Sequence, residues 1–403
     1  MILMKRTKIL VVGAGPVGAI AAYRLALAGL EVALVEADAF PREDMRASTL
    51  HPPTLSMLNE LGLLDTLDAQ GLRAPVYNYR NRRTGNVLAF DMAEIADMTP
   101  YPYRLQCEQF KVTRLITPLL EKLPNAQMLF QRRLINFTQD DDGVTAHFET
   151  PFDIETWRAD YMIGADGANS IVRKWLQIPF EGFTYPEKFL TLSTDHPLEK
   201  EIPNLATVNY VADPDEWCVI LKVPSFWRVL VPVPDDSSDE QILSEDNKTA
   251  IFSRLIGAEK APSVETAHRT IYRVHQRVAE RYRQGRVMLA GDAAHLNNPL
   301  GGFGMNSGVH DAWNVTGKLI EIYKDGGDAD ALLDRYERQR RTVMLEFVQA
   351  QTIKNKQAME SATGDVTAME QELSGLLADP EGRRAYLKRQ AMLSSMEREA
   401  TIQ

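Results

Sequence analysis

The sequence predicts an α/β chain: a Rossmann-like domain, a β-sheet lobe inserted into it, and helices toward the C-terminus. Three observations carry this prediction. A glycine cluster, Gly13-Ala-Gly-Pro-Val-Gly18, follows an apolar run near the start. Two separated stretches, 74–103 and 180–274, are rich in aromatic residues with strand-like alternation. Beyond Asp311 the charged sequence has helical periodicity.

The N-terminal segment has the pattern of a βαβ unit. We expect a buried strand over Lys8–Val12, a helix over Val17–Ala28 that ends at Gly29, and a second parallel strand over Glu31–Glu36. This is the context in which a glycine cluster binds a dinucleotide. The predicted contacts are Gly13 for the tight turn, Gly15 for approach of the pyrophosphate, Gly18 for helix packing, and Pro16 and Val17 at the helix start.

A carboxylate follows at the end of the second predicted strand. Glu36, with Ala37 beside it, lies where an acidic residue accepts hydrogen bonds from a ribose diol. A 2'-phosphate would be repelled by this carboxylate, so the sequence favours FAD or NAD over NADP as the nucleotide held here.

Two further glycine motifs occur in the middle and toward the end of the chain. The first, Gly164-Ala-Asp-Gly167, follows a predicted short strand over Ala159–Ile163, and a helix is predicted earlier, over Val112–Leu123. The second, Gly291-Asp-Ala-Ala-His295, precedes a loop from Pro299 to Asn306 that opens onto a helix. A simple nicotinamide dehydrogenase has no use for these two motifs, so the sequence favours one cofactor held by distant parts of the chain.

The composition changes predict a discontinuous nucleotide-binding domain. We expect its parts at 1–73, 104–179 and 275–345, the inserted lobe at 74–103 and 180–274, and a helical segment at 346–403.

The net charge, the cysteine content and the apolar runs of the 403 residues limit the kinds of binding partner and location that we expect. A net charge of -10 is unfavourable for a nucleic-acid surface, which needs clustered Lys and Arg. Cys107 and Cys218 lack metal-ligand spacing, so neither a disulfide framework nor a metal site is expected. The apolar start suggests a signal peptide, but glycines, Arg24 and Glu31 interrupt it; no membrane span and a cytoplasmic location are expected.

The three motifs, in this order, resemble those of the class A flavoprotein aromatic hydroxylases, the p-hydroxybenzoate hydroxylase-like family of FAD-dependent monooxygenases. The matching segments are Val11–Gly18, Ile163–Ser170 with Arg173, and Gly285–Asn306. The resemblance implies FAD, NADH or NADPH as electron donor and O2 as co-substrate. It also implies hydroxylation of a phenolic or hydroxylated pyridine-type substrate through a flavin C4a-hydroperoxide. A homodimer is a further expectation.

The resemblance also assigns cofactor contacts outside the first motif. Asp292 would hold the ribityl chain, and His295 would orient the loop rather than act as an acid or base. The helix start after Pro299 would face the flavin ring, where amide dipoles stabilise negative charge. The remaining assigned contacts are Arg46, Gln109, Asp166, Gly167, Gly302, Gly304, Met305 and Asn306; for Asp166 a helix cap is the structural alternative.

The resemblance suggests a set of residues for the reaction itself. Lys222 and Arg228 are similar to two cationic positions of p-hydroxybenzoate hydroxylase, but Lys at the first position loses bidentate carboxylate recognition, which argues against a benzoate. Tyr210 would relay a phenolic proton, His51 would serve a substrate hydroxyl, and Pro299 would shape the loop. Ordinary packing or surface exposure is the alternative for Tyr210 and His51. Tyr77, Tyr79, Tyr101 and Tyr103 are candidates for the pocket wall, with a place in the core as their alternative.

Other functions share this cofactor frame. A flavin-dependent halogenase is less favoured because Trp227-Arg-Val-Leu-Val-Pro lacks the second Trp of the halogenase element. A flavin reductase and a non-catalytic flavoprotein remain open, and substrate-stimulated NADH oxidation would separate them from a hydroxylase.

Overall fold

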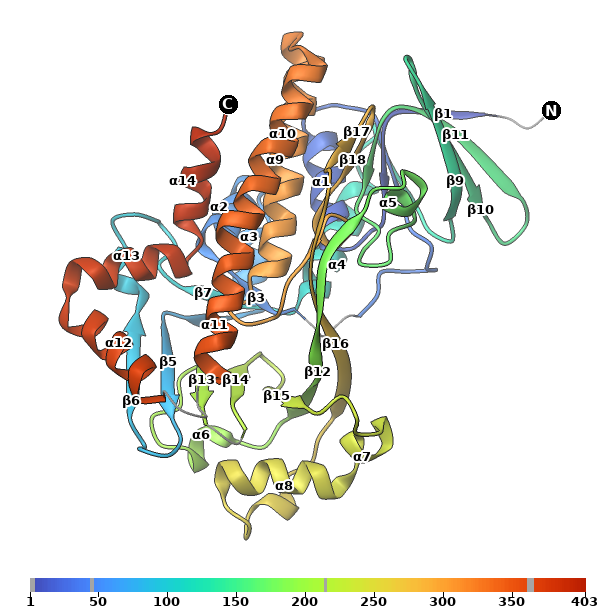
Figure 1. The fold of residues 1–403 in the computed structure, drawn as a ribbon. Helices are drawn as coiled ribbons and strands as arrows, with labels where there is room; N and C mark the ends of the chain where they lie inside the picture. The colour runs from blue at the N-terminus through green and yellow to red at the C-terminus, as the bar shows by residue number, and fades with distance from the viewer. Residues whose placement is uncertain (1–3, 44–46, 214–215, 361–365) are drawn as a thin grey trace.

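The computed structural model describes residues 4–43, 47–213, 216–360 and 366–403. In this part of the chain the strands form two eight-stranded sheets and one three-stranded sheet. Figure 1 shows the second large sheet below the first, with the C-terminal helices α12 and α13 beside strands β5 and β6. The predicted α/β architecture is confirmed.

The first sheet carries the nucleotide-binding frame. The apolar run of β1 is fully buried at its centre, with β2 and β11 pairing on either side in parallel. β11 is longer than the predicted 159–163 because its first half pairs antiparallel with β10. The strands are β17 (Arg283–Gln284), β18 (Val287–Leu289), β11 (Ile154–Gly164), β1 (Lys5–Val12), β2 (Val32–Val35) and β8 (Ala126–Leu129) in spatial order, with β10 (Gly143–Glu149) and β9 (Arg133–Asp140) attached to β11.

The second sheet draws its strands from separated parts of the chain. β5 pairs in parallel with β13, which joins the segment before residue 92 to the later strands. One face is covered by α12 and α13, and the opposite face by α8. The strands in spatial order are β19 (His295–Leu296), β16 (His268–Ala279), β12 (Phe180–Thr194), β15 (Trp227–Val233), β14 (Cys218–Lys222), β13 (Val208–Ala212), β5 (Val76–Asn81) and β6 (Val87–Asp91).

A third sheet consists of three short antiparallel strands from residues 49–106. Its central strand is β7 (Arg104–Gln106), with β3 (Thr49–Leu50) and β4 (Leu72–Ala74) on either side. This sheet places residues 49–50 directly beside residues 105–106.

The helices agree with the sequence periodicity. The first begins at Pro16, which the missing proline N–H permits at a helix start, and Gly29 follows it with φ +79°. The helix predicted from Val112 begins earlier, at Gln109. The α-helices are α1 (Pro16–Leu27), α2 (Pro52–Glu60), α3 (Leu64–Ala69), α4 (Gln109–Leu120), α5 (Ile171–Trp175), α6 (Leu198–Glu201), α7 (Asp239–Leu243), α8 (Glu245–Ile256), α9 (Phe303–Asp325), α10 (Ala329–Val343), α11 (Ala350–Glu360), α12 (Val366–Ala378), α13 (Pro380–Gln390) and α14 (Leu393–Thr401). The remaining helical elements are the 3-10 helices η1 (Met92–Ile95), η2 (Ala261–Ser263) and η3 (Gly291–Ala293) and the π-helix η4 (Met344–Gln349).

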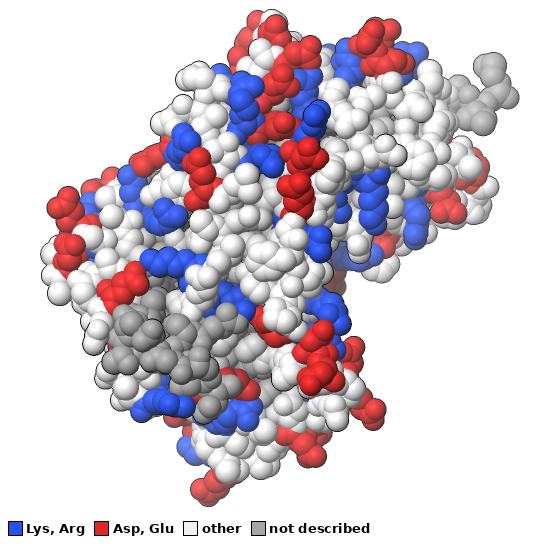
Figure 2. All heavy atoms as spheres, in the orientation of Figure 1, with Lys and Arg blue, Asp and Glu red and all other residues white. Residues whose placement is uncertain are grey.

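The surface carries both signs of charge. On the face shown in Figure 2, acidic and basic side chains are interspersed rather than segregated. Among the described residues, no helix combines the length and apolar character needed to cross a membrane.

Candidate functional site

The three glycine motifs meet at the carboxyl ends of adjacent parallel strands. β11 pairs in parallel with β1 on one side and with β18 on the other. The Ala165 amide, just after β11, donates to the Val12 carbonyl of β1 at 2.8 Å. Nucleotide cofactors bind at this edge of open α/β sheets. Segments more than a hundred residues apart therefore line one site.

The first motif forms a tight turn with an uncapped helix start. Gly13 has φ +99°, and a Cβ there would lie 2.4 Å from the Ala165 carbonyl oxygen. A Cβ on Gly18 would lie 1.9 Å from the Gly13 oxygen, whereas the space beside Gly15 is open. α1 has no side-chain cap and no acidic residue in its first turn. Its first amides suit the negative charge of a pyrophosphate.

Glu36 lies directly beside this turn. Its carboxylate accepts hydrogen bonds from the Ala14 amide at 2.8 Å and the Asp38 amide at 3.0 Å. These bonds hold the acid at the end of β2, while the neighbouring Ala37 is exposed. The acid therefore stands where the sequence places a ribose partner.

Asp166 has a structural duty in the second motif. Its carboxylate accepts from the Ser170 hydroxyl at 2.5 Å and from the Ile171 amide at 2.7 Å, so it caps α5. Gly167 follows with φ +79° and open space beside it. In the third motif, Asp292 is exposed on η3, next to Gly291, which packs against Val17 of the first motif.

The loop from Pro299 to Asn306 is held by its own backbone and by Asn306. The Gly302 amide donates to the Pro299 carbonyl at 3.0 Å. Gly302 has φ +70° and begins α9 without a side-chain cap. Asn306 is fully buried and donates to the carbonyls of Thr49 (2.8 Å) and Gly302 (2.7 Å). Gly304 and Met305 are half-buried in the first turn of α9.

His51 joins this loop to the small sheet. Its amide donates to the Asn306 side-chain oxygen at 2.9 Å, and its Nε2 lies 2.8 Å from the Gly301 carbonyl oxygen. Since a carbonyl only accepts, Nε2 carries the proton and Nδ1 keeps a lone pair. Nδ1 is buried without a hydrogen-bond partner among the described residues. Burial, with the nearby positive charge of Arg104, holds the pKa of His51 well below its usual range.

His295 is part of a buried ionic network rather than a free acid or base. Its Nε2 lies 2.7 Å from Asp311, which also accepts from Arg340 at 2.7 Å and from the Gly291 amide at 3.0 Å. Arg340 pairs in addition with Glu399 of α14. Burial raises the pKa of Asp311, but attraction to His295 and Arg340 outweighs it, so the pKa lies below the usual value. The network ties η3 to the C-terminal helices.

A second buried arginine lies among tyrosines. Arg104 is 1% exposed, donates from Nη1 to the Tyr210 hydroxyl at 3.2 Å, and lies 4.3 Å from the centre of the Tyr77 ring. Tyr77 stacks on Phe90 at 5.3 Å, and Phe90 contacts Tyr386 of α13 at 5.1 Å. Three separate parts of the chain thus build one aromatic cluster, which we call the Arg104 cluster.

Lys222 and Arg228 do not come together. In the β14–β15 register Arg228 lies opposite Leu221, whereas Lys222 lies opposite Trp227. Neighbouring residues of a strand point to opposite faces of the sheet. Arg228 therefore shares its face with Tyr210, while Lys222 lies on the other face, 4.9 Å from the Trp227 ring centre.

Arg46 and Gln109 are the other two residues predicted to contact the cofactor. Arg46 lies outside the described residues. Gln109 is half-buried at the first position of α4, and its amide donates to the Ala47 carbonyl at 3.0 Å. The start of α4 therefore adjoins the segment that follows Arg46 in the sequence.

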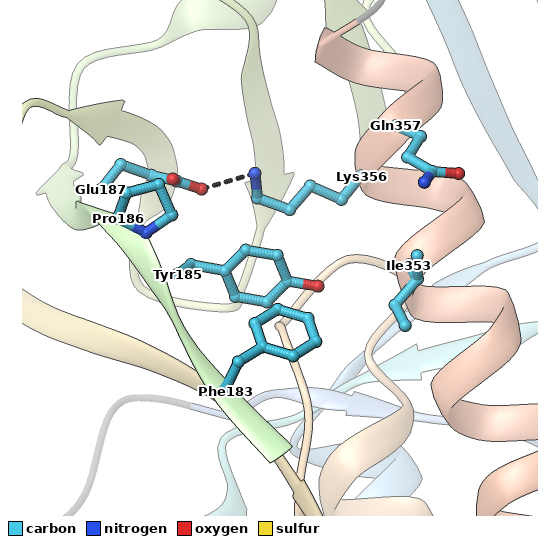
Figure 3. A pocket seen from close by; sticks show the side chains of 7 residues that line it. All are labelled: Phe183, Tyr185, Pro186, Glu187, Ile353, Lys356 and Gln357. Atoms are coloured by element: carbon cyan, nitrogen blue, oxygen red, sulfur yellow. Dashed lines mark ion pairs between the residues drawn. The ribbon is translucent and has the colours of Figure 1, made fainter.

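A cavity of about 330 Å³ lies between β12 and α11 (Figure 3). Lys356 and Glu187 form an ion pair at 2.6 Å above the Tyr185 ring. The Tyr185 hydroxyl accepts from Asn298, the residue before Pro299, at 3.1 Å. None of the predicted site residues lines this cavity, whose described walls are Phe183, Tyr185, Pro186, Glu187, Ile353, Lys356 and Gln357.

Comparison with known proteins agrees with this geometry. The family described as "FAD binding domain" matches residues 6–351. The chain belongs to the FAD binding domain family. Its uncapped helix starts at Gly15 and Gly302, with Glu36 held beside the first, fit the pyrophosphate, ring and ribose of FAD.

Named monooxygenases are among the relatives of this FAD binding domain protein. It is 34% identical to para-nitrophenol 4-monooxygenase of Pseudomonas sp. (strain WBC-3) over 84% of each chain. It is 32% identical to 6-hydroxy-3-succinoylpyridine 3-monooxygenase HspB of Pseudomonas putida (strain DSM 28022 / S16), over 85% of this chain and 86% of the relative.

A solved structure agrees over nearly the whole length. The crystal structure of p-nitrophenol 4-monooxygenase PnpA from Pseudomonas putida DLL-E4 superposes with a TM-score of 0.90 at 31% identity, covering 98% of this chain and 99% of that one. The prediction of a FAD-dependent aromatic monooxygenase that uses O2 and a reduced nicotinamide is confirmed.

Motif analysis did not single out several residues that the structure brings to the site. Arg104 and Tyr386 lie in segments without a motif, and Asp311 lies within a helical pattern. For Arg104, a charged residue enclosed by Tyr101, Tyr103 and Leu105 on a short strand was the available signal.

Proposed function

We propose that this protein hydroxylates a phenol or a hydroxylated pyridine-type ring, with FAD as the bound cofactor and NADH as the donor. The observation that carries the proposal is His51. Its Nδ1 is a buried acceptor, fixed by the Nε2 bond to the loop that begins α9. A substrate hydroxyl is the group that such an acceptor binds. The relatives named for a nitrophenol and a hydroxypyridine support this class.

Bound FAD supplies the redox chemistry that activates O2. The residues proposed to hold it are the turn Gly13–Gly18, Glu36 with Ala37, Gln109, Asp166 with Gly167, Asp292, and Gly302 to Asn306; Arg46 is also proposed. Pro299 is proposed to fix the loop through the carbonyl that accepts from Gly302.

The side chains near the loop can handle a proton without carrying a charge of their own. A neutral His51 accepts a hydrogen bond from a ring hydroxyl and so orients it. The Tyr210 oxygen accepts from Arg104, which leaves its own proton available to donate to a ligand. Phe303 stacks on His51 with ring centres 5.3 Å apart, so an aromatic wall shields the histidine from water. The face shared by Tyr210 and Arg228 is the proposed substrate side; Lys222, on the opposite face, has no proposed part in it.

The test is NADH oxidation by the purified, FAD-loaded protein with a panel of phenols and hydroxypyridines. We expect at least one to stimulate oxidation and to gain one oxygen atom, seen by mass spectrometry of the product. NADPH in a parallel series decides the donor. If no ring compound stimulates a protein that holds FAD, the hydroxylase proposal fails and a non-catalytic flavoprotein is favoured. The cytoplasmic location, the domain boundaries and the homodimer stay predictions.

A further inference from the structure

The cavity between β12 and α11 has no part in the proposed reaction, although it is built like a ligand site (Figure 3). Its volume of about 330 Å³ lies at the small end of the range of ligand pockets, roughly 300 to 1,000 Å³. Phe183, one of its wall residues, is 46% exposed, so the cavity is open to solvent on this side. The size suits a compound with one ring.

A bulge in β12 turns three residues toward this cavity. β12 pairs with β16 at Thr184 and again at Lys188, so the residues from Tyr185 to Glu187 stand opposite Val274 alone. Pro186, in the middle, has no amide hydrogen to give to a neighbouring strand. Bulges re-aim side chains and are frequent next to active sites. All three residues line the cavity.

Two aromatic side chains form a wall on which a ring can pack. Phe183 and Tyr185 are in edge contact, with ring centres 5.0 Å apart and planes at 74°. The Tyr185 hydroxyl accepts from Asn298 at 3.1 Å, which fixes the position of its ring. Ile353 of α11 lines the cavity from the other side. An aromatic ligand between these walls gains apolar burial and ring contacts.

An ion pair lies at one end of the cavity (Figure 3). Lys356 Nζ is 2.6 Å from a carboxylate oxygen of Glu187, and the two side chains are 5% and 15% exposed. A ligand anion would meet the carboxylate and a ligand cation the ammonium, and like charges at this range repel. A neutral hydroxyl, in contrast, can accept from the ammonium and donate to the carboxylate. The pair therefore favours a neutral group that is both donor and acceptor.

The cavity adjoins the loop at the start of α9. The Asn298 side chain, which bonds Tyr185, also donates to the Thr352 carbonyl of α11 at 2.9 Å. The Asn355 side chain of α11 donates to the Leu300 carbonyl of the loop at 3.2 Å. The elements that line the cavity therefore also hold the loop from outside.

We propose that this cavity is a second binding site, for one neutral hydroxylated ring, separate from the site at which hydroxylation is proposed. The ring lies between Phe183, Tyr185 and Ile353, and its hydroxyl lies between Lys356 and Glu187. Binding makes and breaks no covalent bond. The inference goes beyond the proposed function and does not rest on it, because His51 is not among the described walls of the cavity.

The experiment counts the phenol molecules that the FAD-loaded protein binds, by equilibrium dialysis at pH 7 without nicotinamide. Phenol is neutral at this pH because its pKa is close to that of tyrosine, about 10. Ile353→Trp fills the cavity with a larger side chain, and Gln357→Trp does so from an exposed position that the fold tolerates. We expect the wild type to bind one more equivalent of phenol than either variant.

A matched control separates filling of the cavity from the mere presence of a new tryptophan. Lys354 is exposed on the same helix and is not among the described walls of the cavity. Lys354→Trp should therefore bind as many equivalents of phenol as the wild type.

Charge variants test why the site takes a neutral ring. Glu187→Gln leaves the ammonium without its carboxylate, so we expect benzoate to bind in the cavity about tenfold more tightly than in the wild type. Lys356→Met leaves the carboxylate alone and should favour benzylammonium by a similar factor. In each variant, addition of Ile353→Trp should remove the gain, which assigns it to the cavity.

The outcomes distinguish this inference from the proposed function. Equal numbers of phenol equivalents in the wild type, Ile353→Trp and Gln357→Trp overturn the site. Benzoate that occupies the wild-type cavity as tightly as phenol overturns the preference for a neutral group. If no phenol stimulates NADH oxidation but the extra equivalent is present, the proposed function fails and the second site stands. Stimulation without the extra equivalent has the opposite meaning.

Discussion

Two arginines of this protein are equally buried but have opposite surroundings. Arg104 and Arg340 are each 1% exposed. Arg340 pairs with Asp311 and Glu399 and donates to the Ser307 carbonyl at 3.2 Å. Arg104 has a phenol, an aromatic ring and an Nε without a partner. Burial is the same for both, so the partners decide which charge stabilises the fold: Arg340 has two carboxylates, and Arg104 has none among the described residues.

Each arginine also has a buried histidine nearby. Burial lowers the pKa of both histidines, and the positive charge of Arg104 lowers that of His51 further, as the charge of Arg340 does for His310. Among the described residues each histidine has one ring nitrogen with a partner and one without. His310 Nε2 lies 3.1 Å from the Thr54 hydroxyl and His51 Nε2 lies 2.8 Å from the Gly301 carbonyl oxygen, while Nδ1 of both has no partner. The histidines therefore differ in position, because His51 lies against the loop that begins α9 and His310 lies within α9.

The largest expected effect is on the stability of the fold, where the two arginines should differ most. Arg340→Met leaves Asp311 and Glu399 without their cation in the interior, so we expect the free energy of unfolding to fall by about 3 to 5 kcal/mol. Arg104→Met removes a charge that no carboxylate balances in the described part of the chain, and we expect no loss of stability. Urea denaturation of both variants measures this. A similar loss in Arg104→Met would show that Arg104 has a structural role.

The histidines predict a smaller effect that depends on pH. Burial lowers the pKa of His310 to about 3, and the pKa of His51 also lies well below 6.5. Below pH 6.5 the unfolded chain binds protons that the folded chain does not. Stability is therefore full above pH 6.5 and falls with acid, by about 1.4 kcal/mol per pH unit for each histidine.

The corresponding measurement is urea unfolding at pH 6.5 and 4.5. His310→Gln should reduce the difference in unfolding free energy between the two pH values by about 2.3 kcal/mol, which is less than two full pH units at about 1.4 kcal/mol each because the unfolded histidine is already half protonated at pH 6.5. His51→Gln should reduce it in the same direction. An unchanged pH dependence in both variants would mean that these histidines are charged in the folded protein.

The smallest expected effect concerns a cation that keeps contact with water. Lys222 is half-buried over the Trp227 ring at 4.9 Å. Lys222→Met should lower the free energy of unfolding by about 0.5 to 1 kcal/mol, the value of an exposed cation–π contact. Thermal or urea unfolding gives the number. A loss of several kcal/mol would place Lys222 with Arg340 as a structural cation.

The sequence predicted β1, β2 and part of β11 in the first sheet because the signals for these strands are local. The apolar run before Gly13, the glycine spacing and Glu36 each lie within a few residues of the turn or strand that they specify. Gly13 and Gly18 are required where a Cβ would collide with backbone, so the motif predicts the geometry directly. The predicted strand over 159–163 proved longer, since its extension depends on pairing with β10.

The substrate side could not be predicted in the same way. The spacing of Lys222 and Arg228 suggested a pair, but the register of β14 and β15 puts them on opposite faces. For His51 the sequence left a contact with a substrate hydroxyl, ordinary packing and surface exposure open, and the structure has it fully buried against Gly301. Which residues face each other across strands depends on pairing between distant segments, and no local pattern contains that information.

By itself the sequence determined the α/β class, the FAD-type frame and the residues of the glycine turns, because short-range backbone sterics and helix-start chemistry dictate them. Only the tertiary structure decided that Arg104, Tyr77, Tyr210 and Tyr386 share one cluster and that Arg340 is neutralised by Asp311 and Glu399. Whether a buried charge stabilises the fold depends on its partners. Partners far apart in the chain meet only when the sheets and the C-terminal helices pack.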